Sequence, residues 1–327
     1  MYLERWIENM GLGRANEPPI EVSGGLLHKM YMVSTAMDKY AVKVLNAKIM
    51  KRPQALQNTI NSEKISYIMS TDIPVVSSIM VSNRQIHMQD GYYFMVFPWL
   101  EGRSVYAPEI SIRHCQIIGD ILGRIHRLNI SINGMEFDVA NNNLYDWKKL
   151  QEIASEKASD AEWYSCFQKA MDDIEKWNGE ANAAYAYLKQ NRVISHRDLD
   201  PKNVMWNGMQ AYIIDWESAG YINPYQELLE VINYWATDEK GQLTKSYFDA
   251  LTEAYKAHIN LDNVEWDGVF AGSFTGMLGW LEYNAKRAVG LEVADIKETV
   301  VGAKHVINTI DELYSYQEKL KLIREWM

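Results

Sequence analysis

The chain has 327 residues, of which 47% are hydrophobic and 23% are charged, and these ordinary globular values exclude an intrinsically disordered chain and a low-complexity fibre. Its 33 basic and 43 acidic side chains give a net charge of −10 at pH 7. An acidic chain is poorly suited to binding nucleic-acid phosphates over a broad face, and among small ligands it favours cations.

The first hundred residues predict an antiparallel sheet with one helix. Short runs rich in aromatic and β-branched residues, separated by turn residues, occur at 30–33, 40–45 and 92–97. Between the last two runs, apolar residues recur at a spacing closer to helical than to alternating over residues 54–70.

The rest of the chain is predicted to be mainly helical. Apolar residues follow helical spacing over 112–128, and residues 147–189 are polar and favour helix. Short β-type runs at 192–194 and 211–214 interrupt this pattern before helical spacing resumes at Pro224. These elements together predict an α+β fold.

We therefore expect two lobes, residues 1–101 and residues 102–327, joined by a hinge because no linker rich in Gly, Ser or Pro separates them. The first lobe carries 10 basic and 9 acidic side chains, and the second carries 23 and 34. The acidity belongs to the second lobe.

No feature of the sequence predicts secretion or membrane insertion. Glu4 lies where a secretory signal would be basic, and no apolar stretch follows it. The longest uncharged run, residues 268–281, is shorter than the roughly 20 residues of a membrane span. Cys115 and Cys166 are too few for a disulfide framework or a four-cysteine zinc site. We expect a cytoplasmic protein.

The segment from His196 to Asp215 carries the strongest chemical signal. Asp198 and Asn203 lie five residues apart on a loop after a strand, and Asp215 ends the next predicted strand. Such a trio suits phosphoryl transfer: Asp198 would accept a proton from an attacking hydroxyl, and Asn203 and Asp215 would offer oxygen ligands to Mg²⁺ on nucleotide phosphates.

These motifs resemble the catalytic loop and metal-binding strand of the eukaryotic-like kinase fold. The order of these motifs and the residues within them are similar to those of the aminoglycoside phosphotransferase and choline kinase superfamily of small-molecule kinases. The resemblance implies a two-lobed protein-kinase-like fold, with nucleotide bound by the first lobe and the acceptor by the second. It also implies that His196 braces the loop backbone.

The same segment differs from a protein kinase. Asp215 is followed by Trp216 rather than Phe, and the helical pattern at Pro224 leaves no room for an activation segment. Asp200 stands where serine and threonine kinases usually carry lysine, so we expect Lys202 to lie on another face in solvent.

On the nucleotide side, no P-loop sequence occurs. Instead Ser23, Gly24 and Gly25 stand between β-type runs, where glycine backbone N–H groups can approach phosphates. Lys43, in a Val-Ala-Ile-Lys-like context, resembles the strand lysine that binds nucleotide phosphates, and we expect Glu63 of the helix to hold it.

Residues 97–102 match the strand that reads adenine through backbone groups. Because Pro98 has no N–H, the donor must come from Trp99 or Leu100. ATP is the phosphoryl donor that the resemblance implies, and GTP is the alternative.

The acceptor should lie near Asp198 over the second lobe. Aromatic faces and carboxylates both hold ammonium groups. The candidate residues of this kind are Glu217, Tyr221, Trp235, Trp280 and Tyr283. Glu227 stands where the family has an aspartate that supports the catalytic loop.

The sequence thus predicts an enzyme, a Mg²⁺-dependent phosphotransferase that phosphorylates a hydroxyl of a small, amine-bearing and cationic molecule. The alternatives are a choline or ethanolamine kinase and a nucleotide-binding pseudoenzyme that senses or scaffolds. The acceptor's identity and the oligomeric state are left open.

Overall fold

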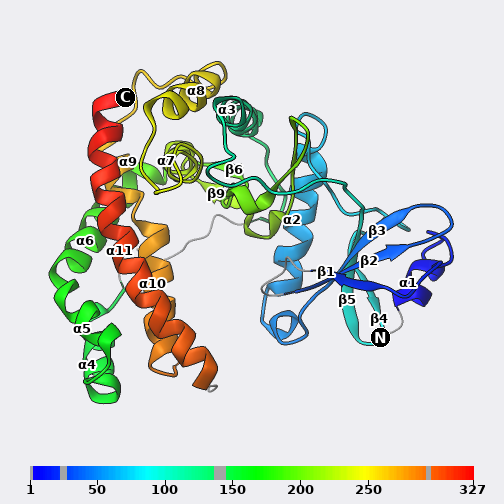
Figure 1. Ribbon diagram of the computed structural model, residues 1–327, viewed down its shortest axis with the longest axis horizontal. Coiled ribbons are helices and arrows are strands. Elements are labelled where there is room, and N and C mark those ends of the chain that lie inside the picture. The colour runs from blue at the N-terminus through cyan, green and yellow to red at the C-terminus, as the bar shows by residue number, and fades with distance from the viewer. Residues whose placement is uncertain (1–2, 23–27, 136–144, 292–295) are drawn as a thin grey trace. The chain divides into compact units, whose positions relative to one another are not determined.

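The structure is a computed structural model that describes residues 3–22, 28–135, 145–291 and 296–327 (Figure 1). The chain divides into two compact units, each built from segments that are not contiguous in sequence. The first unit comprises Met1–Ile110, Arg127–Met135 and Ile194–Gly220, and the second comprises Ser111–His126, Glu136–Val193 and Tyr221–Met327.

A five-stranded antiparallel sheet forms the centre of the first unit, in the order β1-β2-β3-β5-β4. Its elements are α1 (Leu3–Asn9), β1 (Ile20–Val22), β2 (Lys29–Ser34), β3 (Lys39–Val44), η1 (Ile49–Lys51), α2 (Ala55–Met69), β4 (His87–Gln89) and β5 (Tyr92–Pro98). The predicted antiparallel sheet with its inserted helix is confirmed. Short elements without a long periodic pattern, namely α1, β1 and β4, were not predicted.

Helix α1 buries one face against this sheet. Leu3, Trp6 and Ile7 follow helical i, i+3, i+4 spacing and are buried. The indole of Trp6 stacks on Phe94 at 4.7 Å between ring centroids, and its Nε1–H donates to Asp90 at 2.9 Å. The aromatic contact and the satisfied indole together fix α1 on the sheet.

The alternation of side chains along β3 decides where Lys43 points. Tyr40, Val42 and Val44 are buried in the core that contains α1. Because successive side chains of a strand point to opposite faces, Lys43 lies on the other face of the sheet.

Residues 194–220, called the catalytic segment below, begin within β6 (Val193–Ser195) and end within β9 (Gly220–Ile222). Between these strands lie η2 (Pro201–Asn203), β7 (Val204–Asn207), β8 (Gln210–Ile213) and η3 (Trp216–Ser218). Backbone hydrogen bonds tie this segment to the first hundred residues. Ile213 N–H donates to Pro74 O at 2.8 Å, and Val76 N–H donates to Ile213 O at 3.0 Å. The catalytic segment therefore belongs to the first unit, so the division into compact units does not coincide with the boundary expected after residue 101.

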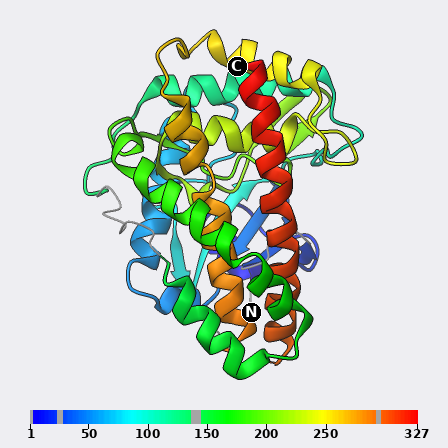
Figure 2. The same cartoon turned by 90° about the vertical axis from the view of Figure 1, so that its left-hand side faces the viewer.

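Helices make up most of the second unit. They are α3 (Ile112–Leu128, whose last two residues fall in the first unit), α4 (Trp147–Ala158), α5 (Glu162–Lys169), α6 (Met171–Leu188), α7 (Pro224–Trp235), α8 (Lys245–Lys256), α9 (Trp266–Gly272), α10 (Thr275–Ala288) and α11 (Ile296–Trp326). Figures 1 and 2 both show α11 running beside α10. In the part of the chain that the structure describes, no helix has both the length and the apolar character needed to span a membrane.

Helices α3 and α8 approach each other closely at Gly119. A Cβ atom at this position would lie 2.1 Å from the backbone oxygen of Leu251. Backbone cannot yield as a flexible side chain can, so only glycine permits this helix contact.

We expect Gly119→Ala to lower the midpoint of thermal unfolding, because overpacking a helix contact costs on the order of 1–3 kcal/mol. Gly179→Ala on α6 is the matched control, since a Cβ atom there meets no atom within 4 Å. Removing glycine from the middle of that helix should stabilise it by roughly 0.5–1 kcal/mol. Calorimetry on both variants checks this, and a Gly119→Ala protein as stable as the wild type would contradict the close approach.

Candidate active site

A single turn of 3₁₀ helix brings Asp198 and Asn203 together. Asp200 caps this turn by accepting from Lys202 N–H at 2.8 Å, and Pro201 occupies its first position, where no N–H is needed. The buried amide of Asn203 then donates to the backbone oxygen of Asp198 at 2.8 Å and to its Oδ2 at 2.9 Å. The loop thus places the two predicted functional groups in direct contact.

The carboxylate of Asp198 also contacts Lys202. Lys202 Nζ lies 3.2 Å from Asp198 Oδ1. Burial raises the pKa of Asp198, and the Lys202 ammonium acts in the opposite direction. The Lys202 side chain is 52% exposed, as expected, but the expectation that it lies on another face is wrong, because its ammonium contacts the Asp198 carboxylate.

His196 holds the backbone directly after β8. Its side chain is fully buried, and its Nε2–H donates to Ile214 O at 3.0 Å. The imidazole also meets the Trp216 ring edge-on at 4.7 Å between centroids. This geometry agrees with a bracing role and keeps the histidine out of direct chemistry.

Asp215 follows this braced strand in a left-handed backbone conformation, with φ +59°. Aspartate tolerates this region better than most residues, and the turn ends β8. Ile214 N–H donates to Asn203 O at 3.0 Å, so the two predicted metal ligands lie on neighbouring, hydrogen-bonded segments.

Lys43 forms ion pairs with two carboxylates of the segment after β8. Its Nζ lies 3.0 Å from Asp215 Oδ1 and also contacts Glu217 Oε1. The Lys43 side chain is only 10% exposed, and burial alone would lower its pKa, but the two carboxylates outweigh burial and raise it. Lys43 is therefore held as a buried cation on the sheet face opposite α1.

Glu63 does not provide the ion pair that we expected for Lys43. Its carboxylate is buried and accepts hydrogen bonds from the hydroxyl and the backbone N–H of Ser78. Burial raises the pKa of Glu63, while these hydrogen bonds lower it. Glu63 is thus satisfied by Ser78, and Glu217 takes the place beside Lys43.

The backbone N–H of Trp99, one of the two expected donors to adenine, is used within the sheet. Trp99 N–H donates to Lys39 O at 3.0 Å and extends the pairing of β3 with β5. The prediction of a backbone donor to adenine is therefore left with Leu100. The predicted phosphate-binding residues Ser23, Gly24 and Gly25 lie outside the described residues.

The predicted metal ligands offer chemistry that fits Mg²⁺. Asn203 and Asp215 both carry oxygen donors, and the Asp215 side chain is 42% exposed. Across the ranges described here, no group of three or more His, Cys, Asp and Glu side chains could hold a metal. A metal at this site would need phosphate and water oxygens in addition to the protein ligands, which is the usual arrangement for Mg²⁺ in kinases.

The predicted acceptor residues divide into three groups. Trp235 is fully buried, so its assignment to substrate binding is wrong: its helical spacing reflects core packing. Glu217 lies beside Lys43, on the predicted nucleotide side. Trp280 and Tyr283 are 45% and 37% exposed on α10 with stacked rings 5.7 Å apart, and Tyr221 is half-buried.

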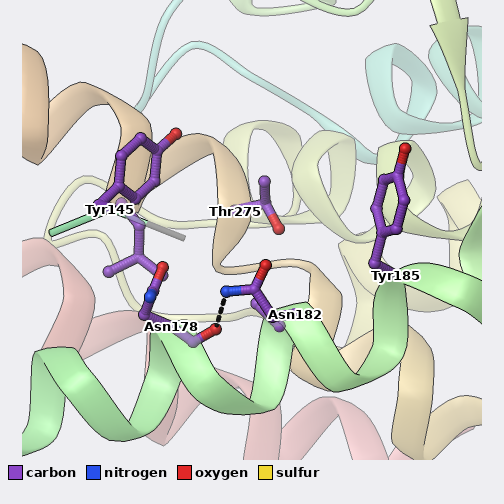
Figure 3. Close-up of a pocket in the computed structure, with 7 residues that line it drawn as sticks. Tyr145, Asn178, Asn182, Tyr185 and Thr275 are labelled. Atoms are coloured by element: carbon purple, nitrogen blue, oxygen red, sulfur yellow. Dashed lines mark hydrogen bonds between the residues drawn. The ribbon is translucent and has the colours of Figure 1, made fainter. Parts of the chain in front are cut away.

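A small pocket, partly open to solvent, lies in the second unit. Figure 3 shows Tyr145 and Tyr185 at its two ends with Asn178, Asn182 and Thr275 between them. Its lining includes no charged side chain and none of the five predicted acceptor residues. Burial and the nearby Glu282 raise the pKa of Tyr145 and so keep its hydroxyl protonated as a donor.

Three buried polar side chains of the second unit form a hydrogen-bonded network. Glu227 Oε2 accepts from His126 Nε2 at 2.9 Å, and the other ring nitrogen of His126 lies 2.8 Å from the Tyr255 hydroxyl. All three side chains are buried. This network accounts for a carboxylate at Glu227 without a substrate.

His28 was not among the site residues predicted from the sequence. Its Nε2 lies 3.2 Å from Glu217 Oε1, and its Nδ1 accepts from Asn46 N–H at 2.9 Å. Its position shortly after the predicted phosphate-binding residues 23–25 could have suggested a role, but its contact with Glu217 is visible only in the folded structure.

Known proteins resemble this chain in sequence. The sequence model of the phosphotransferase enzyme family matches residues 20–259. Stress response kinase A of Escherichia coli strain K12 is 24% identical over 203 residues, which cover 61% of this chain. The match spans only 57% of that kinase's length.

Solved structures share the fold. A spectinomycin phosphotransferase in complex with ADP and spectinomycin has a TM-score of 0.71 at 11% identity, covering 96% of this chain and 98% of that one. An ethanolamine kinase of Plasmodium vivax has a TM-score of 0.59 at 14% identity, covering 92% and 83%. The fold class is therefore confirmed. Since the family match extends over more than half of the sequence and includes both Lys43 and the whole catalytic segment, the chain belongs to the phosphotransferase enzyme family.

Proposed function

We propose that this enzyme is an ATP- and Mg²⁺-dependent kinase that transfers the γ-phosphoryl group to a hydroxyl of a small, amine-bearing molecule. One observation carries the proposal: Lys43 of the sheet contacts Asp215, 172 residues further along the chain, and the same segment holds Asp198 and Asn203 in direct contact within one compact unit. Family membership alone would not require all four residue types to be present.

The contacts of Asp198 suit a general base. Lys202 binds one of its carboxylate oxygens and Asn203 the other, so the carboxylate plane is fixed. The acceptor hydroxyl oxygen would attack the γ-phosphorus as its proton passes to Asp198, and the bond from that phosphorus to the bridging oxygen would break to release ADP. Lys202 would keep positive charge close to the incoming phosphates.

On the donor side, Lys43 would bind nucleotide phosphates, while Asn203 and Asp215 would hold Mg²⁺. The metal, when bound, neutralises the charge that develops on the phosphates. ATP is the proposed donor, since one structurally similar enzyme was solved with ADP, and GTP is the alternative.

An amine-bearing acceptor is supported by the acidic second part of the chain and by the exposed aromatic pair. Residues 102–327 carry 34 acidic and 23 basic side chains. Trp280 and Tyr283 present stacked rings on α10, a surface that favours an ammonium group through cation–π contact. Spectinomycin and ethanolamine, for which two structural relatives are named, both carry amines.

Asp198→Asn should lower kcat by at least about 100-fold, because general-base catalysis typically contributes 10²–10⁴-fold. The substitution keeps the shape and removes the proton acceptor. Phosphoryl transfer to an acceptor panel of aminoglycosides, choline and ethanolamine measures it, with the exposed Asp249→Asn on α8 as control. Near wild-type transfer by Asp198→Asn would refute the assignment, and a wild-type protein that binds nucleotide yet transfers to no acceptor would favour the pseudoenzyme.

Asn203→Ala should raise the Mg²⁺ concentration for half-maximal activity by at least about 10-fold, because even the outer-shell partners of a metal ligand typically contribute 10–100-fold to metal affinity. Chelating the metal with EDTA should abolish transfer by the wild type. Asn207→Ala, an exposed asparagine on β7, is the matched control. An unchanged Mg²⁺ requirement in Asn203→Ala would remove this residue from the metal site.

Trp280→Ala should raise KM for an amine-bearing acceptor by about 5–30-fold, as one lost cation–π contact of roughly 1–2 kcal/mol implies, and leave KM for ATP unchanged. Steady-state kinetics with each substrate varied in turn separates the two effects. The exposed Tyr67→Ala on α2 serves as the aromatic control. An equal rise in both KM values, or none, would place the acceptor elsewhere.

A further inference from the structure

We propose that His28 is a positioning residue of the nucleotide site and that it acts through Glu217 on Lys43. The inference rests on the proposed kinase function, because it assigns Lys43 to the nucleotide. His28, Glu217 and Lys43 form one chain of contacts within the first unit.

The imidazole of His28 is fixed at both ring nitrogens. Asn46 N–H donates to His28 Nδ1 at 2.9 Å, so this nitrogen is an acceptor and carries no proton. The proton of the neutral ring is then on Nε2, which lies 3.2 Å from Glu217 Oε1 and donates to it. The side chain is only 7% exposed, which leaves the ring little freedom to turn.

The hairpin of β2 and β3 sets the position of this histidine. Lys29, the first residue of β2, pairs with Val44 at the end of β3. His28 and Asn46 therefore lie just beyond the same end of the hairpin, and the hydrogen bond between them closes that end. His28 thus lies at the end of the hairpin whose second strand carries Lys43.

Glu217 is held between two donors. Its Oε1 contacts both Lys43 Nζ and His28 Nε2. The carboxylate therefore accepts from both neighbours, and these two contacts fix its position beside Lys43.

Glu217 contacts Lys43 and is not one of the two proposed metal ligands. Asp215 also contacts Lys43 but is a proposed metal ligand. Glu63 is bound to Ser78. A fixed Glu217 would keep the Lys43 ammonium in place for the phosphates, so disturbing His28 should weaken nucleotide binding rather than the chemical step.

Two substitutions of His28 separate its two hydrogen bonds. The amide of His28→Gln reaches the place of Nε2 and can still donate to Glu217. The amide of His28→Asn reaches the place of Nδ1 and can still accept from Asn46, but it loses Glu217. Affinity for ATP and ADP, with Mg²⁺ and with EDTA, is measured by titration calorimetry, together with kcat, KM and the unfolding temperature.

We expect His28→Asn to weaken nucleotide binding about 10-fold in both metal conditions and to raise KM for ATP with little change in kcat, as loss of a hydrogen bond to a charged group implies. His28→Gln should restore most of the affinity. In a Glu217→Ala background, His28→Asn should have no further effect, because the partner is already gone. His87→Asn on β4, at the far edge of the same sheet, is the control and should leave affinity unchanged.

Other outcomes overturn the inference. Wild-type affinity in His28→Asn would show that Lys43 needs no positioning by this chain of contacts. Equal losses in the Gln and Asn variants, with lowered unfolding temperatures, would show a purely structural role. Tighter binding would show that Glu217 competes with the phosphates for Lys43. The proposed kinase function fails separately, if Lys43→Met binds nucleotide as well as the wild type does.

Discussion

The active site depends on one buried ammonium group. Lys43 lies in a sheet with little access to solvent, where an uncompensated charge would be too costly to keep. Two carboxylates, Asp215 and Glu217, compensate it at direct contact. Because both follow β8, more than 170 residues along the chain from Lys43, the ion pair ties the sheet to the catalytic segment.

That constraint accounts for the composition of the first compact unit. Residues 194–220 are distant in sequence from the sheet but belong with it, through the backbone bonds at Ile213 and the ion pairs of Lys43. The same segment carries Asp198, whose carboxylate is fixed by Asn203 and Lys202. The residues proposed for donor binding and for the general base are therefore positioned by the same packing, which explains how a site built from separate segments keeps its geometry.

The sequence predicted features that depend on a local pattern, and it did not predict which side chains from distant segments contact each other. The loop at Asp198, the strand of Lys43 and the helix with Glu63 were all predictable, because motif spacing and periodicity are local properties. The partner of Lys43 was not predictable, because the sequence does not show which carboxylate contacts it. In the fold, Glu63 accepts hydrogen bonds from Ser78 and Glu217 contacts Lys43. The prediction that Trp235 binds substrate failed for a related reason, because helical spacing is the same for a residue in the core as for one at a binding face.

The most direct test of this account is a crystal structure of the enzyme with a non-hydrolysable ATP analogue and Mg²⁺. In this complex Lys43 Nζ should lie within hydrogen-bonding distance of a phosphate oxygen while still in contact with Glu217. Oxygen atoms of Asn203 and Asp215 should lie about 2.1 Å from the metal. A nucleotide whose phosphates reach neither Lys43 nor a metal on these two residues would contradict it.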